Sequence, residues 1–388
     1  MPVHSRHAGT PPARRSPSSA AGAIPGQEAL PLRLGDGAVR PWRQAPRPSL
    51  DVASLDALLA DPELTDVLVN GVEVWVDRGG GLQRTGLSLG DESEVRRLAQ
   101  RLAAAAGRRL DDASPCVDVQ LADGTRLHAV LPPIARGGPY LSLRTFRHRV
   151  FTLEELVATG GVEPPAAELL AGVVKARLPY LISGGTGSGK TTILSALLSL
   201  VPPDERIVVV EDAAELRPAH PHTVLLQART SNVEGVGEVS MRDLVRQALR
   251  MRPDRLVVGE CRGAEVVDLL GALNTGHEGG AATVHANRPA DVPARLEALG
   301  LLGLVPRPAL HALVGAALRV VVHLQRDREG ARSVAEICVV QSGERRPVRV
   351  VPAWRRGAGP GPGAVALARL LLDGGVQPPE SLRPEGLR

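Results

Sequence analysis

Lysine is almost absent from this chain of 388 residues, which carries 44 arginines but only two lysines, Lys175 and Lys190. Aromatic residues make up only 2% of the sequence, so a hydrophobic core must be built from Leu, Val, Ile and Ala. The bias toward Arg, Ala, Gly and Pro is typical of codon usage and by itself indicates no function. A lysine that is kept against this background indicates a position where a compact ammonium group is wanted.

Cysteine is also scarce, and the three cysteines, Cys116, Cys261 and Cys338, lie far apart in the chain. Their spacing matches neither a paired zinc motif nor the disulfide framework of a small secreted domain. No run of 18 apolar residues occurs, and no apolar segment follows the arginines near the N-terminus. The sequence therefore predicts a protein of the reducing cytoplasm, with neither a secretion signal nor a membrane-spanning helix.

A strong excess of one charge is missing from most of the chain. The formal net charge is +4, but residues 1–49 alone contribute +5, from seven arginines and two acidic residues. The remaining residues therefore sum to about −1, which gives no sign of a nucleic-acid-binding surface beyond a local basic patch. Residues 1–49 also hold nine prolines and show no apolar period, so we expect them to form a disordered arm.

Residues 50–150 have the pattern of a small α+β domain. Alternating apolar residues predict one hairpin around Asn70-Gly71 and a second around Asp123-Gly124. Between them, residues 91–106 predict a helix that begins with an acidic capping box and ends at a glycine. No catalytic motif falls within this domain.

From about residue 164 the pattern changes to apolar strands that alternate with helices, as in a parallel sheet. The predicted fold class is therefore α/β, with the smaller α+β domain in front. We expect the α/β domain over residues 151–353 and a flexible, Gly- and Pro-rich tail over residues 354–388. Strands are predicted at 180–183, 206–210, 255–259 and 281–285, and helices at 165–177, 190–200, 240–251, 263–274 and 289–300.

One glycine-rich segment between a predicted strand and a predicted helix carries the strongest signal. The spacing Gly184-x-x-x-x-Gly189-Lys190-Thr191 satisfies the phosphate-loop pattern. Glycines let successive N–H groups turn toward an anion, and the helix that follows adds its N-terminal dipole. Lys190 would reach the β- and γ-phosphates, and the Thr191 hydroxyl would complete the shell of a Mg²⁺ ion. We therefore predict an ATP site formed by Gly184, Gly185, Thr186, Gly187, Ser188, Gly189, Lys190, Thr191 and Thr192.

Two later strands end in acidic residues. The first is followed by Glu211 and Asp212, with Glu215 just beyond, and the second is followed by Gly259 and Glu260. Acidic side chains at the carboxyl ends of parallel strands lie where ligands bind in open α/β sheets. We expect Glu211 to act on the Mg²⁺ ion or its water, and Glu260 to polarise the attacking water. An ordinary acidic turn is the alternative for Glu211, and which acid is the general base stays open.

Two histidines and two arginines complete the set of candidate residues. His277 and His285 lie eight residues apart, which is wrong for a helical zinc pair but allows a histidine to hydrogen-bond the γ-phosphate. Arg126 and Arg144 lie on predicted strands of the first domain, and a phosphoryl-transfer site would recruit an arginine from that domain or from the next subunit. Structural histidines and solvated surface arginines are the alternatives.

The order of these motifs resembles that of the secretion-ATPase superfamily, which powers type II and type IV secretion and pilus assembly. The resemblance covers about residues 50–345 and is most specific over residues 249–263. Within the superfamily, the chain looks most similar to the tight-adherence pilus ATPases. Two departures are Cys261, where an aliphatic residue is expected, and the lack of the paired CxxC insert of many type II motors. The remaining segments that carry the resemblance are Pro115-x-Val117-Asp118, Leu131-Pro132-Pro133, Leu143-Arg144, Thr275-Gly276-His277 and His285-Ala286-Asn287.

The resemblance implies a RecA-like P-loop NTPase core that hydrolyses ATP with Mg²⁺. It also implies a cytoplasmic homohexamer, peripheral at the inner face of the membrane and docked on inner-membrane pilus or secretion platform proteins, with no stable nucleic-acid partner. A RecA-like nucleic-acid motor, such as a helicase or conjugative DNA pump, and a regulator that binds ATP without turnover remain as alternatives. The roles implied are nucleotide and Mg²⁺ binding for Lys190 and Thr191, the Asp box for Glu211, the Walker B motif for Glu260, the His box for His277 and His285, and phosphate contact for Arg126 and Arg144.

Overall fold

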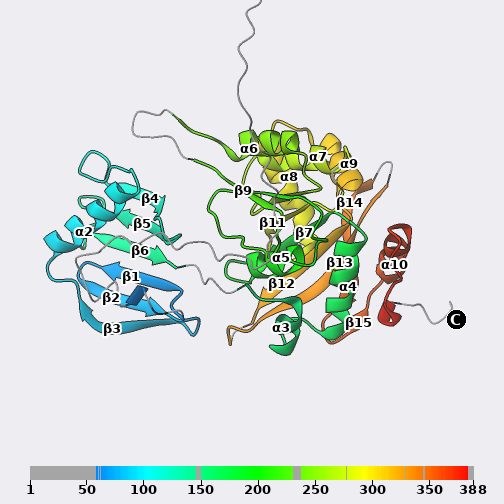
Figure 1. The fold of residues 1–388 in the computed structure, drawn as a ribbon, viewed down its shortest axis with the longest axis horizontal. Helices are drawn as coiled ribbons and strands as arrows, with labels where there is room; N and C mark the ends of the chain where they lie inside the picture. Colours follow the sequence, from blue (N-terminus) through cyan, green and yellow to red (C-terminus); the bar gives the residue numbers. More distant parts are fainter. Residues whose placement is uncertain are drawn as a thin grey trace, which may run out of the picture. The chain divides into compact units, whose positions relative to one another are not determined.

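Two β-sheets organise the part of the chain that the structure, a computed structural model, describes (Figure 1). The described residues are 58–59, 61, 63–145, 150–229, 237–276, 278–327, 329–343 and 346–382. They all belong to one unit of the chain that begins at Ala45. The predicted arm, residues 1–49, lies outside the described residues.

The first sheet has six antiparallel strands in the order β3-β2-β1-β6-β5-β4. Helix α2 (Glu92–Ala105) buries Val95, Leu98 and Leu102 in the same hydrophobic cluster as the inward-facing residues of the sheet. The predicted capping box at Asp91 is present, and both predicted hairpins form. The strands are β1 (Asp66–Asn70), β2 (Glu73–Asp77), β3 (Leu82–Ser88), β4 (Cys116–Gln120), β5 (Arg126–Val130) and β6 (Tyr140–Arg144).

The second sheet has nine strands in the order β15-β14-β13-β12-β7-β11-β10-β8-β9. The six strands from β12 to β9 run parallel, and an antiparallel ribbon of three strands extends the sheet beyond β12. Its strands are β7 (Tyr180–Gly184), β8 (Ile207–Glu211), β9 (Thr223–Gln227), β10 (Arg255–Val258), β11 (Ala281–His285), β12 (Val320–Arg326), β13 (Arg332–Gly343), β14 (Arg346–Arg355) and β15 (Gly359–Pro360).

Helices cover both faces of this sheet, which explains why its central strands are apolar throughout. Residues of α4, α5 and α10 join one hydrophobic cluster, and residues of α6 to α9 join the cluster on the other face. The five helices predicted from residue 165 to residue 300 are all present within a few residues of their expected bounds. The helices are α3 (Leu153–Ala158), α4 (Pro164–Lys175), α5 (Lys190–Leu198), α6 (Met241–Ala248), α7 (Glu265–Leu273), α8 (Val292–Leu302), α9 (Arg307–Ala317) and α10 (Ala364–Asp373).

The C-terminal region differs from the flexible tail that composition favours over residues 354–388. Trp354 is buried, the glycine-rich stretch after it forms β15, and α10 packs Leu367 and Leu371 into the core with no exposed surface. The apolar residues of α10 recur at helical spacing, and this pattern outweighs the glycines and prolines that precede it. Residues 383–388 lie outside the described part.

No single described helix is long and apolar enough to cross a membrane, although α8 and α9 with the turn before them reach that length and composition as a pair bent by 119°.

Candidate functional site

A cavity of about 1200 Å³ lies where the parallel strands of the second sheet end. Its lining includes the phosphate loop after β7, the acidic residues after β8 and β10, and His285 at the end of β11. In the sheet register His285 lies opposite Gly184, so the end of β11 adjoins the start of the loop. The cavity thus forms at the edge where open α/β sheets bind ligands.

The phosphate loop has the backbone that its glycines permit. Gly187 and Gly189 have φ values of 69° and 94°, which residues with a side chain rarely adopt. A Cβ atom on Gly184 would lie 2.5 Å from the Ser188 hydroxyl and 2.7 Å from the Leu324 carbonyl oxygen. Helix α5 then begins directly at Lys190, so its free N–H groups face the loop.

Lys190 is held against the loop by its own main chain. The Lys190 ammonium donates hydrogen bonds to the carbonyl oxygens of Gly184 at 3.2 Å and Gly185 at 2.9 Å. Burial lowers the pKa of Lys190, and the charges of Glu260 and Glu215 oppose that shift. The one lysine in the loop is therefore in place beside two carboxylates and the glycine-rich turn.

Glu215, and not Glu211, is the acid that contacts Thr191. The Thr191 hydroxyl donates to Glu215 Oε2 at 3.3 Å. Burial raises the pKa of Glu215, and the hydrogen bond from Thr191 opposes the rise. Thr191 and Glu215 are thus two adjacent oxygen donors that could hold a Mg²⁺ ion beside bound phosphates.

Glu211 faces the main chain of the turn that follows β8. Its carboxylate accepts hydrogen bonds from the amides of Glu215 at 3.1 Å and Leu216 at 3.0 Å, and only 4% of the residue is exposed. Burial raises the pKa of Glu211 to about 7 despite these two hydrogen bonds. A Cβ atom on Gly259 would lie 2.6 Å from Glu211 Cγ, so the glycine before Glu260 makes room for Glu211.

Arg262 connects the two acidic clusters and was not singled out by the sequence. Its guanidinium donates to Glu260 Oε2 at 2.7 Å and to Asp212 Oδ2 at 2.8 Å. Glu260, Asp212 and Arg262 all line the cavity. The only sequence signal for this role is that Arg262 follows Glu260 by two residues, at the same strand end.

Of the two predicted histidines and two predicted arginines, only His285 and Arg144 line the cavity in the described part of the chain. His285 lines the cavity, whereas His277 lies outside the described residues. His285 is the last residue of β11. The residues that lead into β11 from Glu278 lie at the opposite end of that strand, where the Gly280 carbonyl accepts a hydrogen bond from the Tyr180 amide.

Arg144 ends β6 and lines the cavity, and its side chain also donates to Asp66 at 3.1 Å. Arg126 lies beside Arg144 in the register but is bound to both carboxylate oxygens of Asp118, at 2.9 and 2.7 Å, and does not line the cavity. Arg144 therefore lines the cavity directly. Arg126 lies outside the lining, and its pKa is raised chiefly by the hydrogen bond with Asp118 and also by the charges of Asp212 and Glu215, two acids of the cavity.

The residues of the loop fit a bound phosphate. Ser188 is buried, and its hydroxyl has no hydrogen-bond partner in the described part of the chain. An orphaned hydroxyl among glycines, next to a lysine and a helix N-terminus, is well suited to a phosphate oxygen. No group of three or more His, Cys, Asp or Glu among the described residues could hold a metal by itself, so a Mg²⁺ ion here would need phosphate and water oxygens besides Thr191 and Glu215.

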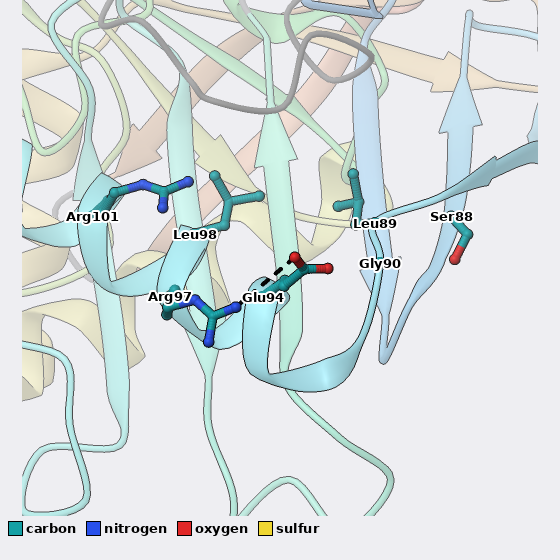
Figure 2. A pocket seen from close by; sticks show the side chains of 7 residues that line it. All are labelled: Ser88, Leu89, Gly90, Glu94, Arg97, Leu98 and Arg101. Atoms are coloured by element: carbon teal, nitrogen blue, oxygen red, sulfur yellow. Dashed lines mark ion pairs between the residues drawn. The ribbon is translucent and has the colours of Figure 1, made fainter.

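A second, smaller cavity of about 280 Å³ lies at α2 in the first sheet's domain (Figure 2). It is lined by Arg97, Arg101 and the capping residue Glu94, which is paired to Arg97 at 3.9 Å. It contains none of the residues that the sequence predicts for the site. The larger cavity is therefore the candidate functional site.

The chain is similar to known proteins over most of its length. A family model described as "Type II/IV secretion system protein" matches residues 49–349. A putative conjugal transfer protein of Mycobacterium tuberculosis (strain ATCC 25618 / H37Rv) is 59% identical over 324 residues, which cover 82% of this chain and 92% of that protein. Type IV secretion system protein PtlH of Bordetella pertussis is 32% identical over 355 residues, 83% of this chain and 98% of that protein.

Solved structures show the same fold. The pilus retraction motor PilT, determined with bound ADP, has a TM-score of 0.54 at 21% identity and covers 76% of this chain and 84% of its own. The ATPase DotB of Legionella pneumophila has a TM-score of 0.52 at 20% identity, covering 76% and 83%. The predicted fold class, a RecA-like core with a smaller N-terminal α+β domain, is thereby confirmed.

Proposed function

The chain belongs to the family of type II/IV secretion system proteins, within the secretion-ATPase superfamily, and we propose that it is an ATP-hydrolysing motor that powers pilus assembly or protein secretion. One observation carries the proposal: a single cavity is lined by Lys190 on its phosphate loop, the Thr191–Glu215 pair, and Glu260 just after β10. These are the parts that phosphoryl transfer from a bound nucleotide requires.

Each residue of the cavity has a distinct task in this proposal. Bound MgATP supplies the phosphoryl group that is transferred to water. Lys190 and the Ser188 hydroxyl bind phosphate oxygens, while Thr191 and Glu215 hold the Mg²⁺ ion or its water ligands. Glu260 orients the attacking water and accepts its proton.

Arg262 joins Glu260 to Asp212 at the edge of the cavity. While Arg262 bridges Glu260 and Asp212, the Glu260 carboxylate is engaged on one oxygen and turned toward a cation. Arg144 lines the same cavity and is the arginine we assign to the transition-state charge.

The finer assignment follows the motif order. Pro115-x-Val117-Asp118, Leu131-Pro132-Pro133 and Leu143-Arg144 resemble the N-terminal domain of the tight-adherence pilus ATPases and support a motor of that type. In this proposal the motor works as a homohexamer at the cytoplasmic face of the membrane on inner-membrane platform proteins. A DNA pump or helicase is not favoured, because the chain beyond residue 49 has no excess of positive charge.

The two lysines of the chain provide a matched test. Lys190→Ala should abolish steady-state ATP turnover with Mg²⁺, because the β- and γ-phosphates lose their ammonium partner. Lys175→Ala removes an exposed lysine at the end of α4 and should leave turnover unchanged. The assay is phosphate release, with and without membranes that carry the platform proteins. Equal turnover in wild type and Lys190→Ala would refute the site, and tight ATP binding without turnover would favour a nucleotide-gated regulator.

A further inference from the structure

A buried histidine lies directly behind the phosphate loop. His323 on β12 is 6% exposed, and its Nδ1 atom lies 2.9 Å from the hydroxyl of Ser183, which is completely buried. Ser183 is the residue before Gly184, where the loop begins. The two residues are 140 positions apart in the sequence, but they lie opposite each other on the neighbouring strands β12 and β7.

The same imidazole ring also hydrogen-bonds the main chain of Asn287, two residues after His285. In the sheet β7 lies between β11 and β12, with Ser183 opposite both Val284 and His323. A side chain on β12 that reaches the turn after β11 therefore crosses over β7, at the position of Ser183. The histidine thus connects three neighbouring strands at the edge that carries the cavity.

The chemistry of a neutral imidazole suits this bridge. Burial lowers the pKa of His323. Glu336, which lies opposite His323 on β13, the Asn287 main chain and Asp291 in the turn before α8 each act to raise it. A neutral ring has one donor and one acceptor. When the Ser183 hydroxyl donates to Nδ1, the remaining N–H group of the neutral ring is available to the Asn287 main chain.

Strand β12 also touches the loop through its backbone. The pairing of β12 with β13 shifts register between His323 and Leu324. The Leu324 carbonyl oxygen lies only 2.7 Å from where a Cβ atom on Gly184 would be. A displacement of β12 at His323 would therefore also move the Leu324 carbonyl that packs against Gly184, the first glycine of the loop.

We propose that His323 is a positioning residue for the phosphate loop: it fixes Ser183, and with it the main chain of Gly184, relative to the turn that follows His285. The effect of this positioning on catalysis rests on the proposed function, because that effect presumes that ATP binds at the loop. Through this bridge, the turn after His285 and the loop that carries Lys190 keep a fixed distance. His323 does not line the cavity, so it acts only through these partners.

The chain offers a matched control. His311 on α9 is also largely buried and makes two hydrogen bonds, accepting from the Val348 amide at 3.0 Å and contacting Glu297 at 2.9 Å. It belongs to no part of the cavity. His323→Leu and His311→Leu therefore both remove an imidazole that is at least partly buried and makes two contacts, but only the first removes the bridge.

The test measures ATP binding with Mg²⁺ and amide hydrogen exchange on the full chain. We expect His323→Leu to weaken ATP binding roughly tenfold, the equivalent of one lost hydrogen bond, and to speed exchange of the amides at residues 184–190. His311→Leu should change neither quantity. Ser183→Ala should reproduce the loss, and adding it to His323→Leu should cost nothing further, because both changes break the same contact.

Conservative variants separate positioning from packing. His323→Asn keeps a polar atom near Nδ1 for Ser183, and His323→Gln keeps one near Nε2 for Asn287, so each should recover part of the affinity. The proposal is overturned if His323→Leu binds ATP as wild type does, if His311→Leu loses as much, or if neither conservative variant recovers affinity. Wild-type protein that binds no ATP would instead refute the proposed function, and the exchange measurement would still decide the positioning role.

Discussion

Glu211 ends β8 and Glu215 follows it by four residues, yet their carboxylates meet different partners. Glu211 accepts hydrogen bonds from two backbone amides, and Glu215 accepts one from the Thr191 hydroxyl. A carboxylate that serves a cation must keep oxygen lone pairs directed at it, and the turn takes up Oε1 of Glu211 through two amides and Oε2 through a longer contact of 3.3 Å. We therefore assign the Mg²⁺ contact to Glu215 and the shape of the turn to Glu211.

This assignment predicts different responses to Mg²⁺. Glu215→Gln should raise the Mg²⁺ concentration needed for half-maximal ATP turnover by roughly tenfold or more, because the cation loses a charged partner. Glu211→Gln keeps an oxygen for the two amides and should change that concentration far less. Titration of ATP turnover with Mg²⁺ compares the two variants, and the opposite order would return the metal role to Glu211.

The phosphate loop could be predicted from single residues, but its partners could not. Gly184, Gly189, Lys190 and Thr191 are fixed by a spacing whose chemistry is local. The roles of Glu215 and Arg262 depend on how two turns fold against each other after their strands, and sequence spacing alone does not contain that geometry. His323 lies outside any motif, and only the strand order brings it to Ser183.

At the scale of elements, the sequence predicts those with a strong apolar period and misses those without one. The buried strands β7, β8, β10 and β11 and their helices were all predicted. Strand β3 exposes nearly every residue, including Leu82 and Leu87, so it shows no alternation of buried and exposed positions. Edge strand β9 is likewise only partly buried. Pairing with a neighbouring strand, rather than burial, holds these two in place.

Helix α10 follows the matched family region, residues 49–349, and contributes to the stability of the core. Leu371 is fully buried and lies 3.3 Å from where a Cβ atom on Gly172 of α4 would be. Leu371→Ala should lower the free energy of unfolding by about 2–4 kcal/mol, because it leaves a cavity between α10 and α4.

Val365 provides the control on the same helix. It is 60% exposed, so Val365→Ala should change the free energy of unfolding by less than about 0.5 kcal/mol. Urea unfolding followed by circular dichroism measures both variants. Equal, small effects of the two changes would show that α10 is not docked in solution.

At the scale of the whole molecule, Glu211 links the stability of the fold to pH. Its pKa rises from an ordinary value of 4.5 to about 7 in the folded chain, chiefly through burial. Between these pH values the folded state binds a proton that the unfolded state has lost, so stability falls as pH rises. The free energy of unfolding falls by on the order of 3 kcal/mol in total, and the decrease is complete above about pH 7.

The urea midpoint of the wild type should therefore decrease from pH 5 to pH 8. Glu211→Gln cannot titrate and keeps an oxygen for the amides of Glu215 and Leu216, so its midpoint should fall less over the same range. The difference between the two curves isolates Glu211 from the other acids of the chain. Parallel curves would mean that the Glu211 carboxylate is ionised in the folded protein throughout this range.

The scarcity of lysine has a practical consequence for following this protein. A protease that cuts only after lysine has two target bonds in the whole chain, one after Lys175 and one after Lys190. Lys175 is exposed at the end of α4, whereas Lys190 lies in the first turn of α5 with its ammonium bound to the loop. The first bond serves as an internal reference, and the second can be cut only when the start of α5 unwinds. The chain thus carries its own proteolytic reporter for opening of the nucleotide site.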